Sequence, residues 1–464
     1  MIPLTLTEIA QIAGGAVHAG ADVEVTGPAF IDTRHPEPGG LFVAFEGERV
    51  DGHDFAAAAI DAGAAAVLST RPVDVPCVVV PDARQALARL AHHVIRKLPD
   101  TSVVALTGSQ GKTSTKDLIA HVLSTAGTTV ATVGSFNNEL GFPLTVLRAE
   151  PATEYLVLEM GARGIGHIRA LCEVAPPYLS LVLNVGKAHL GEFGSQQAIA
   201  QAKGEIVEAL TEDGVAVLNA DDPLVAAMAA RTAATVCTYG TGADVDVRLE
   251  ALTLDDLGRP RFDLVARGSS AHVEMRLVGE HHATNASAAA AAALALGLPL
   301  DAVAAALAGV TAISGGRMEL HERADGVTVI DDAYNANPDS MRAGLKALAA
   351  IGRRRPEART IAVLGEMLEL GPASTDEHDA VGRLAVRLDI HRLLVVGEGA
   401  RPIHLGASLE GSWGEESVFV PDNDAALDWL HRNLEPGDVV LFKASHGAEL
   451  SRVARAVLAD GVAS

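Results

Sequence analysis

Short apolar runs recur along the chain, and most of the stretches between them carry apolar residues at every third or fourth position. The runs are typical of buried strands, and the spacing between them is typical of amphipathic helices. Strands that alternate with helices favour parallel sheets covered by helices, so the pattern predicts an α/β protein. The predicted strands are 103–106, 155–158, 179–184, 215–218, 327–330, 360–364, 393–396 and 439–442.

Two interruptions divide this pattern. Lys-Leu-Pro-Asp breaks it just before the strand 103–106, and Ile-Ser-Gly-Gly at 313–316 breaks it before the strand 327–330. A chain of 464 residues is also too long for one ordinary hydrophobic core. We therefore expect three domains, over 1–99, 100–313 and 314–464.

The most apolar segment runs from Ala286 to Leu300, is mostly alanine and contains Gly297 and Pro299. A membrane span needs about 20 predominantly apolar residues, so we expect a buried helix here instead. The N-terminus lacks the basic and apolar regions of a signal peptide. The three cysteines are odd in number and far apart, and together these features predict a cytoplasmic protein.

Net charge narrows the classes of partner. The chain carries a net charge of −23, so nucleic acid and anionic membranes would be repelled. We expect a monomer that binds small molecules, with no nucleic-acid partner and no membrane insertion. An anionic substrate would need a local site, built from a helix N-terminus, a few basic side chains or Mg²⁺.

Polar motifs follow six of the predicted strands. In open α/β sheets, ligands bind at the carboxyl ends of the strands. Turns occur at strand ends in every fold, but six such motifs with charged or amide side chains favour a binding site over plain turns. The motifs are Gly108–Thr113, Glu159-Met160-Gly161, Asn184 with His189, Asp331–Asn335, Gly365-Glu366-Met367 and Lys443–His446.

The first motif lies within residues 107–115, TGSQGKTST, between a predicted strand and a helical pattern. Glycines and a helix N-terminus would direct backbone N–H groups at phosphates. Lys112 would bridge the β- and γ-phosphates, and Thr113 or Ser114 would place a hydroxyl on Mg²⁺. Leu106 stands where a longer phosphate loop would have its first glycine. The alternative is a glycine turn in which Thr113 only caps the helix.

A second constellation contains Lys203. Ser195 is expected to cap a helix that begins near Gln196, and Lys203 falls on its apolar face. The pattern leaves two readings open: the lysine stem reaches along the apolar face to water, or Lys203 serves a site. His189 and Glu159 would be possible Mg²⁺ partners in such a site. The apolar face comprises Ile199, Ile206 and Leu210.

Nine segments together resemble the Mur ligase family of peptidoglycan synthesis, and the resemblance covers nearly the whole chain. They are TGSQGKTST, SFNNELGFPLTVL, LVLEMGA, NVGKAHLGEFGS, AQAKGEI, NADD, SGGRMEL, DDAYNANPDSM and LGEMLELG. The phosphate loop of that family is Gly-x-x-Gly-Lys-Thr, which accounts for the missing first glycine of the longer loop. The N-terminal IDTRHPEPGGLFVAFEGERVDGHDF is similar to the uridine-nucleotide-binding domain of its later members.

The resemblance implies a three-domain α/β fold with a central P-loop ATPase sheet and a Rossmann-like C-terminal domain that carries the amine substrate. It also implies an ATP- and Mg²⁺-dependent ligase that joins D-alanyl-D-alanine to UDP-N-acetylmuramoyl-tripeptide. ATP would phosphorylate the terminal carboxylate of the peptide. The amine would then attack the acyl phosphate and release phosphate. Closure of the third domain over the second would assemble the site.

Roles for single residues follow from matching the family motifs. The expected catalytic residues are Lys112, His189 and Lys203, the last as a carbamate formed with CO₂. The expected Mg²⁺ ligands are Thr113, Glu159 and His189. The expected ATP contacts are Gly108, Ser109, Gln110, Gly111, Lys112, Thr113, Ser114, Asn285, Arg317, Asp332 and Asn335. The expected contacts to the UDP-linked donor and the acceptor are Thr33, Arg34, Asn137, Asn138, Lys443 and His446.

One segment departs from the family pattern. A Lys-Gly-Ser-Arg-like stretch is expected after the last main strand, and this chain has Lys-Ala-Ser-His at 443–446. The arginine that would hold the carboxylate of the acceptor is therefore missing. His446 or Arg452 is the expected substitute.

Three alternatives remain beside this interpretation. A sister ligase would add a diamino acid, but its Asp-Asn-Pro-Arg motif is missing, the nearest match being Pro-Asp-Asn-Asp at 421–424. Folylpolyglutamate synthetase is a related amide ligase, but the N-terminal segment argues against it. The third alternative is a nucleotide-binding regulatory module that has lost ligation, and the intact Lys112, Glu159, His189 and Lys203 argue against it. Amine-dependent release of ADP separates a ligase from such a module.

Overall fold

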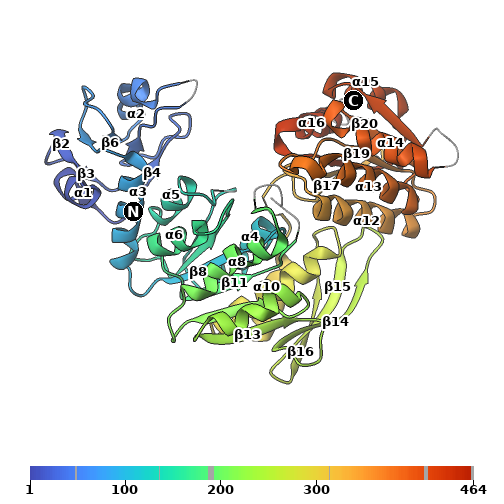
Figure 1. Ribbon diagram of the computed structural model, residues 1–464, viewed down its shortest axis with the longest axis horizontal. Helices are drawn as coiled ribbons and strands as arrows, with labels where there is room; N and C mark the ends of the chain where they lie inside the picture. The colour runs from blue at the N-terminus through green and yellow to red at the C-terminus, as the bar shows by residue number, and fades with distance from the viewer. Residues whose placement is uncertain (48–49, 135, 187–192, 313, 412–415, 461–464) are drawn as a thin grey trace.

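The computed structural model describes residues 1–464 except 48–49, 135, 187–192, 313, 412–415 and 461–464. The chain forms three lobes in sequence order, each built around its own main sheet (Figure 1). The N-terminal lobe, blue in Figure 1, and the C-terminal lobe, red, lie at opposite ends of the central lobe. This arrangement confirms the expected α/β class.

The N-terminal lobe contains a five-stranded sheet in the order β2-β7-β6-β5-β4 and a separate pair of strands, β1 and β3. Its helix α3 begins after Asp82, whose side chain accepts hydrogen bonds from two backbone N–H groups of the first turn. Its elements are β1 (Leu4–Thr5), α1 (Leu6–Ala13), β2 (Ala16–Ala19), β3 (Glu24–Val25), β4 (Ala29–Phe30), β5 (Leu41–Val43), α2 (Ala56–Asp61), β6 (Ala66–Ser69), β7 (Cys77–Val79) and α3 (Ala83–Arg96).

The central lobe contains a nine-stranded sheet in the order β16-β15-β14-β13-β12-β11-β8-β10-β9. The strands from β9 to β14 are parallel, and β15 and β16 extend the sheet in antiparallel pairing. Its elements are β8 (Ser102–Thr107), α4 (Lys112–Ser124), β9 (Thr129–Ala131), α5 (Gly141–Val146), β10 (Tyr155–Glu159), α6 (His167–Val174), β11 (Leu179–Val182), α8 (Gln196–Glu208), β12 (Val215–Asn219), α9 (Pro223–Ala226), β13 (Thr235–Gly240), β14 (Val247–Leu254), β15 (Pro260–Ala266), β16 (Ser269–Glu274), α10 (His281–Ala295) and α11 (Leu300–Gly309).

Alternate residues of the central strands pack on opposite faces of the sheet. Val104 and Leu106 of β8 pack with α4, α10 and α11, whereas Val103 and Ala105 pack with α5, α6 and α8. The second of these cores continues without a break into the N-terminal lobe through α1 and α3. The N-terminal and central lobes therefore share one hydrophobic core.

The C-terminal lobe contains a six-stranded sheet in the order β17-β18-β22-β19-β20-β21, parallel except for β17. Helices α12, α13 and α14 cover one face, and α15 and α16 cover the other, as in Rossmann-like folds. Its elements are β17 (Glu319–Glu322), β18 (Thr328–Asp331), α12 (Pro338–Arg354), β19 (Thr360–Leu364), α13 (Ser374–Arg387), β20 (Arg392–Val396), α14 (Arg401–Glu410), β21 (Ser417–Val420), α15 (Asn423–Asn433), β22 (Val439–Lys443) and α16 (Leu450–Asp460).

All eight predicted strands are confirmed, although β11 ends two residues before its predicted limit. The predicted helix over 286–300 is wrong in its bounds. Helix α10 begins earlier and ends at Ala295, because Gly297 adopts a left-handed backbone with φ +92° and Pro299 precedes a separate helix, α11. Within the described part of the chain, the helices are too short or too polar to cross a membrane.

We propose domain limits of 1–99, 100–313 and 314–464. The first limit falls between the end of α3 and the start of β8, and the second falls between α11 and β17. Each main sheet then lies within one domain.

Candidate active site

The phosphate-loop segment connects β8 to α4, as predicted. Leu106 is buried in β8 opposite Leu181. The position where a longer phosphate loop would begin is therefore still part of the strand. Gly111 adopts φ +77°, and a Cβ there would lie 2.8 Å from Oδ1 of Asn285. Both the backbone conformation and the close approach of α10 therefore favour glycine at this position.

Asn184, just after β11, holds the loop in shape. Its Oδ1 accepts hydrogen bonds from the backbone N–H groups of Ser109 and Gln110, both at 3.0 Å, and its Nδ2 donates to the carbonyl of Gln110 at 3.2 Å. In this arrangement these two N–H groups are engaged by Asn184, and the expected ATP contacts of Ser109 and Gln110 stay predictions. The N–H groups in the first turn of α4 remain for a phosphate. The sequence signal for Asn184 was an amide side chain at a strand end.

Lys112 opens α4 and is half-buried. Its Nζ donates to the carbonyl of Gly108 at 2.8 Å. Burial lowers the pKa of Lys112, while the nearby carboxylate of Glu159 acts in the opposite direction. The buried hydroxyl of Thr113 accepts a hydrogen bond at 3.1 Å from Arg317, which belongs to the chain beyond α11. The guanidinium of Arg317, from the predicted C-terminal domain, therefore contacts the phosphate loop of the central domain.

Glu159, at the end of β10, offers a free carboxylate oxygen. Its Oε1 accepts from Nδ2 of Asn137 at 2.7 Å, but its buried Oε2 has no hydrogen-bond partner within the described residues. An unpaired buried carboxylate oxygen is costly, and a bound cation would satisfy it. Glu159 and the hydroxyl of Thr113 thus fit Mg²⁺.

The predicted metal set is only partly visible. His189, the third predicted ligand, lies outside the described residues, as do its immediate neighbours. Among the residues that are described, no group of three or more His, Cys, Asp or Glu side chains is arranged to hold a metal ion. A Mg²⁺ ion here would also take oxygens from the phosphates of its substrate.

Lys203 lies on α8, which begins after Ser195 as predicted, and the Ser195 hydroxyl accepts from the backbone N–H of Ala198 at 3.1 Å. The side chain of Lys203 does not reach water along the helix, because the residue is only 4% exposed. Burial first, and then the charge of Lys112, holds the pKa of Lys203 well below its usual range. The ammonium of Lys203 is therefore destabilised by its buried position near Lys112 of the phosphate loop.

Helix α10 presents further unpaired polar atoms beside the loop. Asn285, an expected adenine contact, is buried and its Nδ2 has no partner within the described part of the chain. His282 lies one turn earlier on α10 and is 1% exposed. Neither of its ring nitrogens has a hydrogen-bond partner among the described residues. Burial lowers the pKa of His282 well below its usual value, so the ring is neutral. His282 was not predicted as a site residue from the sequence. Two polar residues, His282 and Asn285, in an alanine-rich helix would have been a usable signal.

In the C-terminal lobe, Asp332 is engaged by Lys443. The Nζ of Lys443 donates to Oδ2 of Asp332 at 2.6 Å and to the carbonyl of Asn335 at 3.2 Å, and Lys443 is 2% exposed. In this arrangement the ammonium of Lys443 is engaged by Asp332 and Asn335, and its expected contact with the acceptor stays a prediction. Its ammonium instead fixes the segment that carries Asp332 and Asn335.

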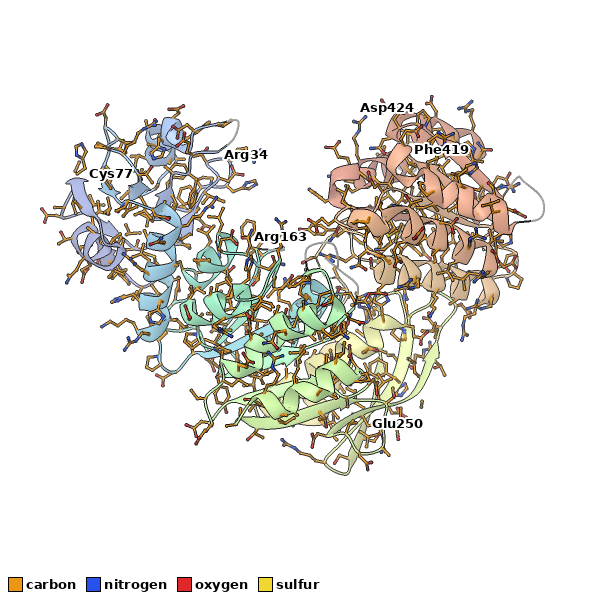
Figure 2. The ribbon with its side chains drawn as sticks, viewed as in Figure 1. Arg34, Cys77, Arg163, Glu250, Phe419 and Asp424 are labelled. Atoms are coloured by element: carbon orange, nitrogen blue, oxygen red, sulfur yellow. The ribbon has the colours of Figure 1, made fainter. Side chains whose placement is uncertain are left out.

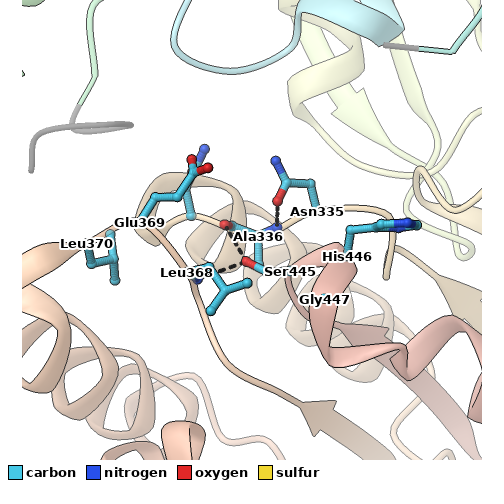
Figure 3. Close-up of a pocket in the computed structure, with 9 residues that line it drawn as sticks. Asn335, Ala336, Leu368, Glu369, Leu370, Ser445, His446 and Gly447 are labelled. Atoms are coloured by element: carbon cyan, nitrogen blue, oxygen red, sulfur yellow. Dashed lines mark hydrogen bonds between the residues drawn. The ribbon is translucent and has the colours of Figure 1, made fainter. Parts of the chain in front are cut away.

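A pocket of ≈ 160 Å³ in this lobe is lined by residues of two strand-end motifs, Asp331–Asn335 and Lys443–His446, and by the segment that follows a third, Gly365-Glu366-Met367 (Figure 3). The hydroxyl of Ser445 accepts from the backbone N–H of Leu368 at 2.9 Å and donates to the carbonyl of Ala336 at 3.3 Å, which ties the motifs together. His446 stands at the rim with its ring centroid 5.7 Å from that of Tyr334. The pocket is lined by Asn335, Ala336, Asn337, Leu368, Glu369, Leu370, Ser445, His446 and Gly447.

Arg452, the other expected substitute for the missing arginine, points elsewhere. Its guanidinium pairs with Asp424 of α15 at 2.8 Å, and it does not line the pocket. Of the two expected substitutes for the missing arginine, only His446 therefore lines the pocket.

The predicted donor contacts are dispersed. Arg34 pairs with Asp32 at 2.7 Å on the N-terminal lobe, next to the partly exposed Thr33 and apart from Arg163 of the central lobe (Figure 2). Asn138 accepts from the backbone N–H groups of Leu140 and Gly141, so it fixes the turn that leads into α5, whereas Asn137 donates to Glu159. The structure thus brings Thr113 and Lys112 close to Arg317, and Gly111 close to Asn285, whereas Asn335 lines the pocket of the C-terminal lobe. Thr33 and Arg34 lie on the N-terminal lobe.

Comparisons with known proteins give the same domain order. Residues 29–99 match the family description "Mur ligase family, catalytic domain", residues 106–293 match "Mur ligase middle domain", and residues 316–446 match "Mur ligase, glutamate ligase domain". A relative from Mycobacterium tuberculosis, named UDP-N-acetylmuramoyl-tripeptide–D-alanyl-D-alanine ligase, is 51% identical, with 99% of this chain and 98% of the relative covered.

Two solved structures share the fold over nearly the whole chain. MurF from Acinetobacter baumannii superposes with a TM-score of 0.86 at 31% identity, with 98% of this chain and 99% of that chain covered. MurF ligase from Thermotoga maritima, solved in complex with ADP, superposes with a TM-score of 0.80 at 29% identity, with 94% of this chain and 98% of that chain covered. With relatives of this identity along its full length and three family domains in order, the chain belongs to the Mur ligase family.

Proposed function

We propose that this protein is the ATP-dependent ligase that joins D-alanyl-D-alanine to UDP-N-acetylmuramoyl-tripeptide in cytoplasmic peptidoglycan precursor synthesis. The observation that carries the proposal is the convergence of Lys112, Glu159 and Lys203 at one edge of the central sheet, with Arg317 reaching them from the C-terminal side. The names of the relatives support the substrate pair.

The site binds ATP through groups that bear positive charge or expose N–H donors. The first turn of α4 and the ammonium of Lys112 face the phosphates, and Arg317 adds a guanidinium beside Thr113. Mg²⁺, held by Thr113 and Glu159, would neutralise phosphate oxygens during transfer. These contacts localise positive charge in a protein whose net charge is −23.

The reaction requires positioning rather than a protein nucleophile. A carboxylate oxygen of the UDP-linked peptide attacks the γ-phosphorus of ATP, and the bond to the β-phosphate oxygen breaks to release ADP. The amine of the acceptor then attacks the acyl carbon, loses a proton to solvent and expels phosphate. The residues of this chain hold the reacting groups in line and stabilise charge on the phosphoryl oxygens.

Lys203 acts as a carbamate in this proposal. Its neutral amine adds to CO₂: the N–C bond forms, one C–O π pair becomes the carboxylate lone pair, and the nitrogen loses a proton to solvent. The lowered pKa of Lys203 supports this step, because only the neutral amine reacts. A carbamate ¹³C signal in ¹³CO₂-equilibrated protein, lost in Lys203→Ala, is expected. Full activity of Lys203→Ala would contradict the assignment.

The pocket of the C-terminal lobe is the proposed acceptor site. D-Alanyl-D-alanine has one amine, one carboxylate and two methyl groups, and the pocket offers His446, the Asn335 amide and apolar Leu368 and Leu370. His446→Ala should raise KM for D-alanyl-D-alanine by about tenfold, with little change in KM for ATP. An equal change in both constants would remove His446 from the acceptor site.

The decisive experiment measures ADP release by the purified protein with each donor and acceptor. The UDP-tripeptide with D-alanyl-D-alanine should support turnover, and the UDP-dipeptide with meso-diaminopimelate or L-lysine should not. The reverse result would identify the sister ligase. Binding of ADP with no amine-dependent turnover of any pair would identify a nucleotide-binding module.

A further inference from the structure

Lys116 and Asp117 lie one turn beyond Lys112 on α4 and make contacts that phosphate binding does not require. The ammonium of Lys116 is buried, donates to the carbonyl of Thr132 at 2.7 Å and forms an ion pair with Oδ1 of Asp117. A buried ammonium is stable only when its partners are fixed, so this contact determines where both side chains lie.

The second oxygen of Asp117 binds the start of the C-terminal lobe. Oδ2 accepts from the backbone N–H of Ser314 at 2.9 Å. Three residues later, Arg317 donates to Thr113, four residues before Asp117 on the same helix. The segment 314–317 is therefore attached to α4 at two points about 6 Å apart along the helix axis.

The same network reaches the candidate metal ligand. The hydroxyl of Thr132, whose carbonyl accepts from Lys116, also accepts from the backbone N–H of Glu159 at 3.1 Å. A continuous series of hydrogen bonds thus runs from Ser314 through Asp117, Lys116 and Thr132 to Glu159. Arg317 also lies over the ring of Tyr334, with 4.4 Å from its guanidinium carbon to the ring centroid.

We propose that Lys116 and Asp117 form a positioning pair that fixes the segment 314–317 against α4 and thereby holds Arg317 at the phosphate loop. Neither side chain touches the substrate; the pair acts through Arg317 and through the backbone that carries the C-terminal lobe. The proposal rests on the ligase function proposed above. It assigns a role in turnover to a contact that could otherwise serve stability alone.

The test compares two substitutions of Asp117 with a matched control. Asp117→Ala removes the contact to Ser314, whereas Asp117→Asn keeps an acceptor oxygen and loses only the charge opposite Lys116. Asp61→Ala, an exposed position on the N-terminal lobe, controls for loss of one carboxylate. We expect kcat for ligation to fall by about 10- to 100-fold in Asp117→Ala and less in Asp117→Asn. ADP affinity should stay within about threefold of the unsubstituted protein.

A double-mutant cycle with Arg317→Ala separates positioning from stability. If Asp117 acts through Arg317, adding Asp117→Ala to Arg317→Ala should change kcat by less than about threefold. An equal loss of kcat in both backgrounds, or a fall in ADP affinity as large as the fall in kcat, would overturn the proposal. Lys116→Met, which removes the partner but keeps the volume of the stem, should reproduce the effect of Asp117→Ala.

A measurement without turnover keeps this test separate from the ligase assignment. Small-angle X-ray scattering of the ADP-bound protein should differ between Asp117→Ala and the unsubstituted chain, because the C-terminal lobe loses one attachment. If no substrate pair supports turnover but this difference persists, the ligase assignment fails and the positioning pair stands. Identical scattering together with unchanged kcat would reject the pair.

Discussion

At the scale of single residues, the site depends on where positive charge is held. Lys112→Ala should reduce kcat by about 10²- to 10³-fold, because the transferring phosphoryl group loses a fixed ammonium. Lys97→Ala, an exposed lysine at the end of α3, is the matched control. ADP release measures activity, and unfolding midpoints should be equal for both variants. Near-normal turnover of Lys112→Ala would contradict the ATP site.

Replacing Lys203 should raise the stability of the protein and at the same time abolish its activity. Burial lowers its pKa from 10.5 in the folded state, so below that pH the unfolded chain binds more protons and folding is penalised. In CO₂-depleted buffer, Lys203→Met should therefore raise the free energy of unfolding at pH 7 by about 1–3 kcal/mol while abolishing ligation. The gain should shrink as the pH rises towards 10.5.

Urea unfolding between pH 7 and 10 measures this gain. Lys346→Met, at an exposed position on α12, should show no pH-dependent gain. A lower stability of Lys203→Met across the whole range would mean that the buried amine has a stabilising partner.

Single residues were predictable where their signal is local. Gly111 and Lys112 are defined by spacing within one loop, and the Ser195 cap by its position before an amphipathic pattern. The contact between Lys443 and Asp332 was not predictable, because the two residues are 111 positions apart in sequence. No local pattern distinguishes an ammonium that binds a substrate from one that binds a buried carboxylate.

At the scale of elements, Gly297 separates α10 from α11. Its φ of +92° is unfavourable for any residue with a Cβ, although no atom would contact that Cβ within 4 Å. Gly297→Ala should therefore lower the free energy of unfolding by about 1–2 kcal/mol through backbone strain alone. Gly297→Asn should cost less, because asparagine tolerates this conformation better. Equal stability of both variants in urea unfolding would show that the backbone relaxes.

Elements were predictable when they were buried on both faces. Strands such as β8 and β19 appear as uninterrupted apolar runs because helices cover both sides of a parallel sheet. The antiparallel extension β14–β16 was missed, since its strands are partly exposed and carry charged residues on one face. The strands of the N-terminal lobe, β1 to β7, were missed because each has only two to four residues.

At the scale of the whole molecule, the shared core should make the N-terminal and central lobes one cooperative unit. One cluster joins buried residues of both lobes, from Met1 to Met228. The core of the C-terminal lobe forms separate clusters, in which Val278 is the one buried member from the central lobe among the described residues. A fragment ending at residue 312 should therefore unfold in one cooperative transition. A fragment over 100–312 should aggregate or bind hydrophobic dyes, because α5 and α6 lose the apolar face of α3.

Circular dichroism and calorimetry of the two fragments check this prediction. Cooperative unfolding of the fragment over 100–312 would mean that the interface with α3 is dispensable.

The strand order of the C-terminal lobe has a consequence for the protein as it leaves the ribosome. The last strand to be synthesised, β22, lies between β18 and β19 at the centre of the sheet. Until Val439–Lys443 has emerged, those two strands face each other across a vacant position with unpaired backbone groups. The sheet of the nascent lobe therefore cannot be completed until its last strand has emerged. A premature stop before Val439 would spare five of the six strands yet leave the whole lobe as an aggregation-prone nascent intermediate.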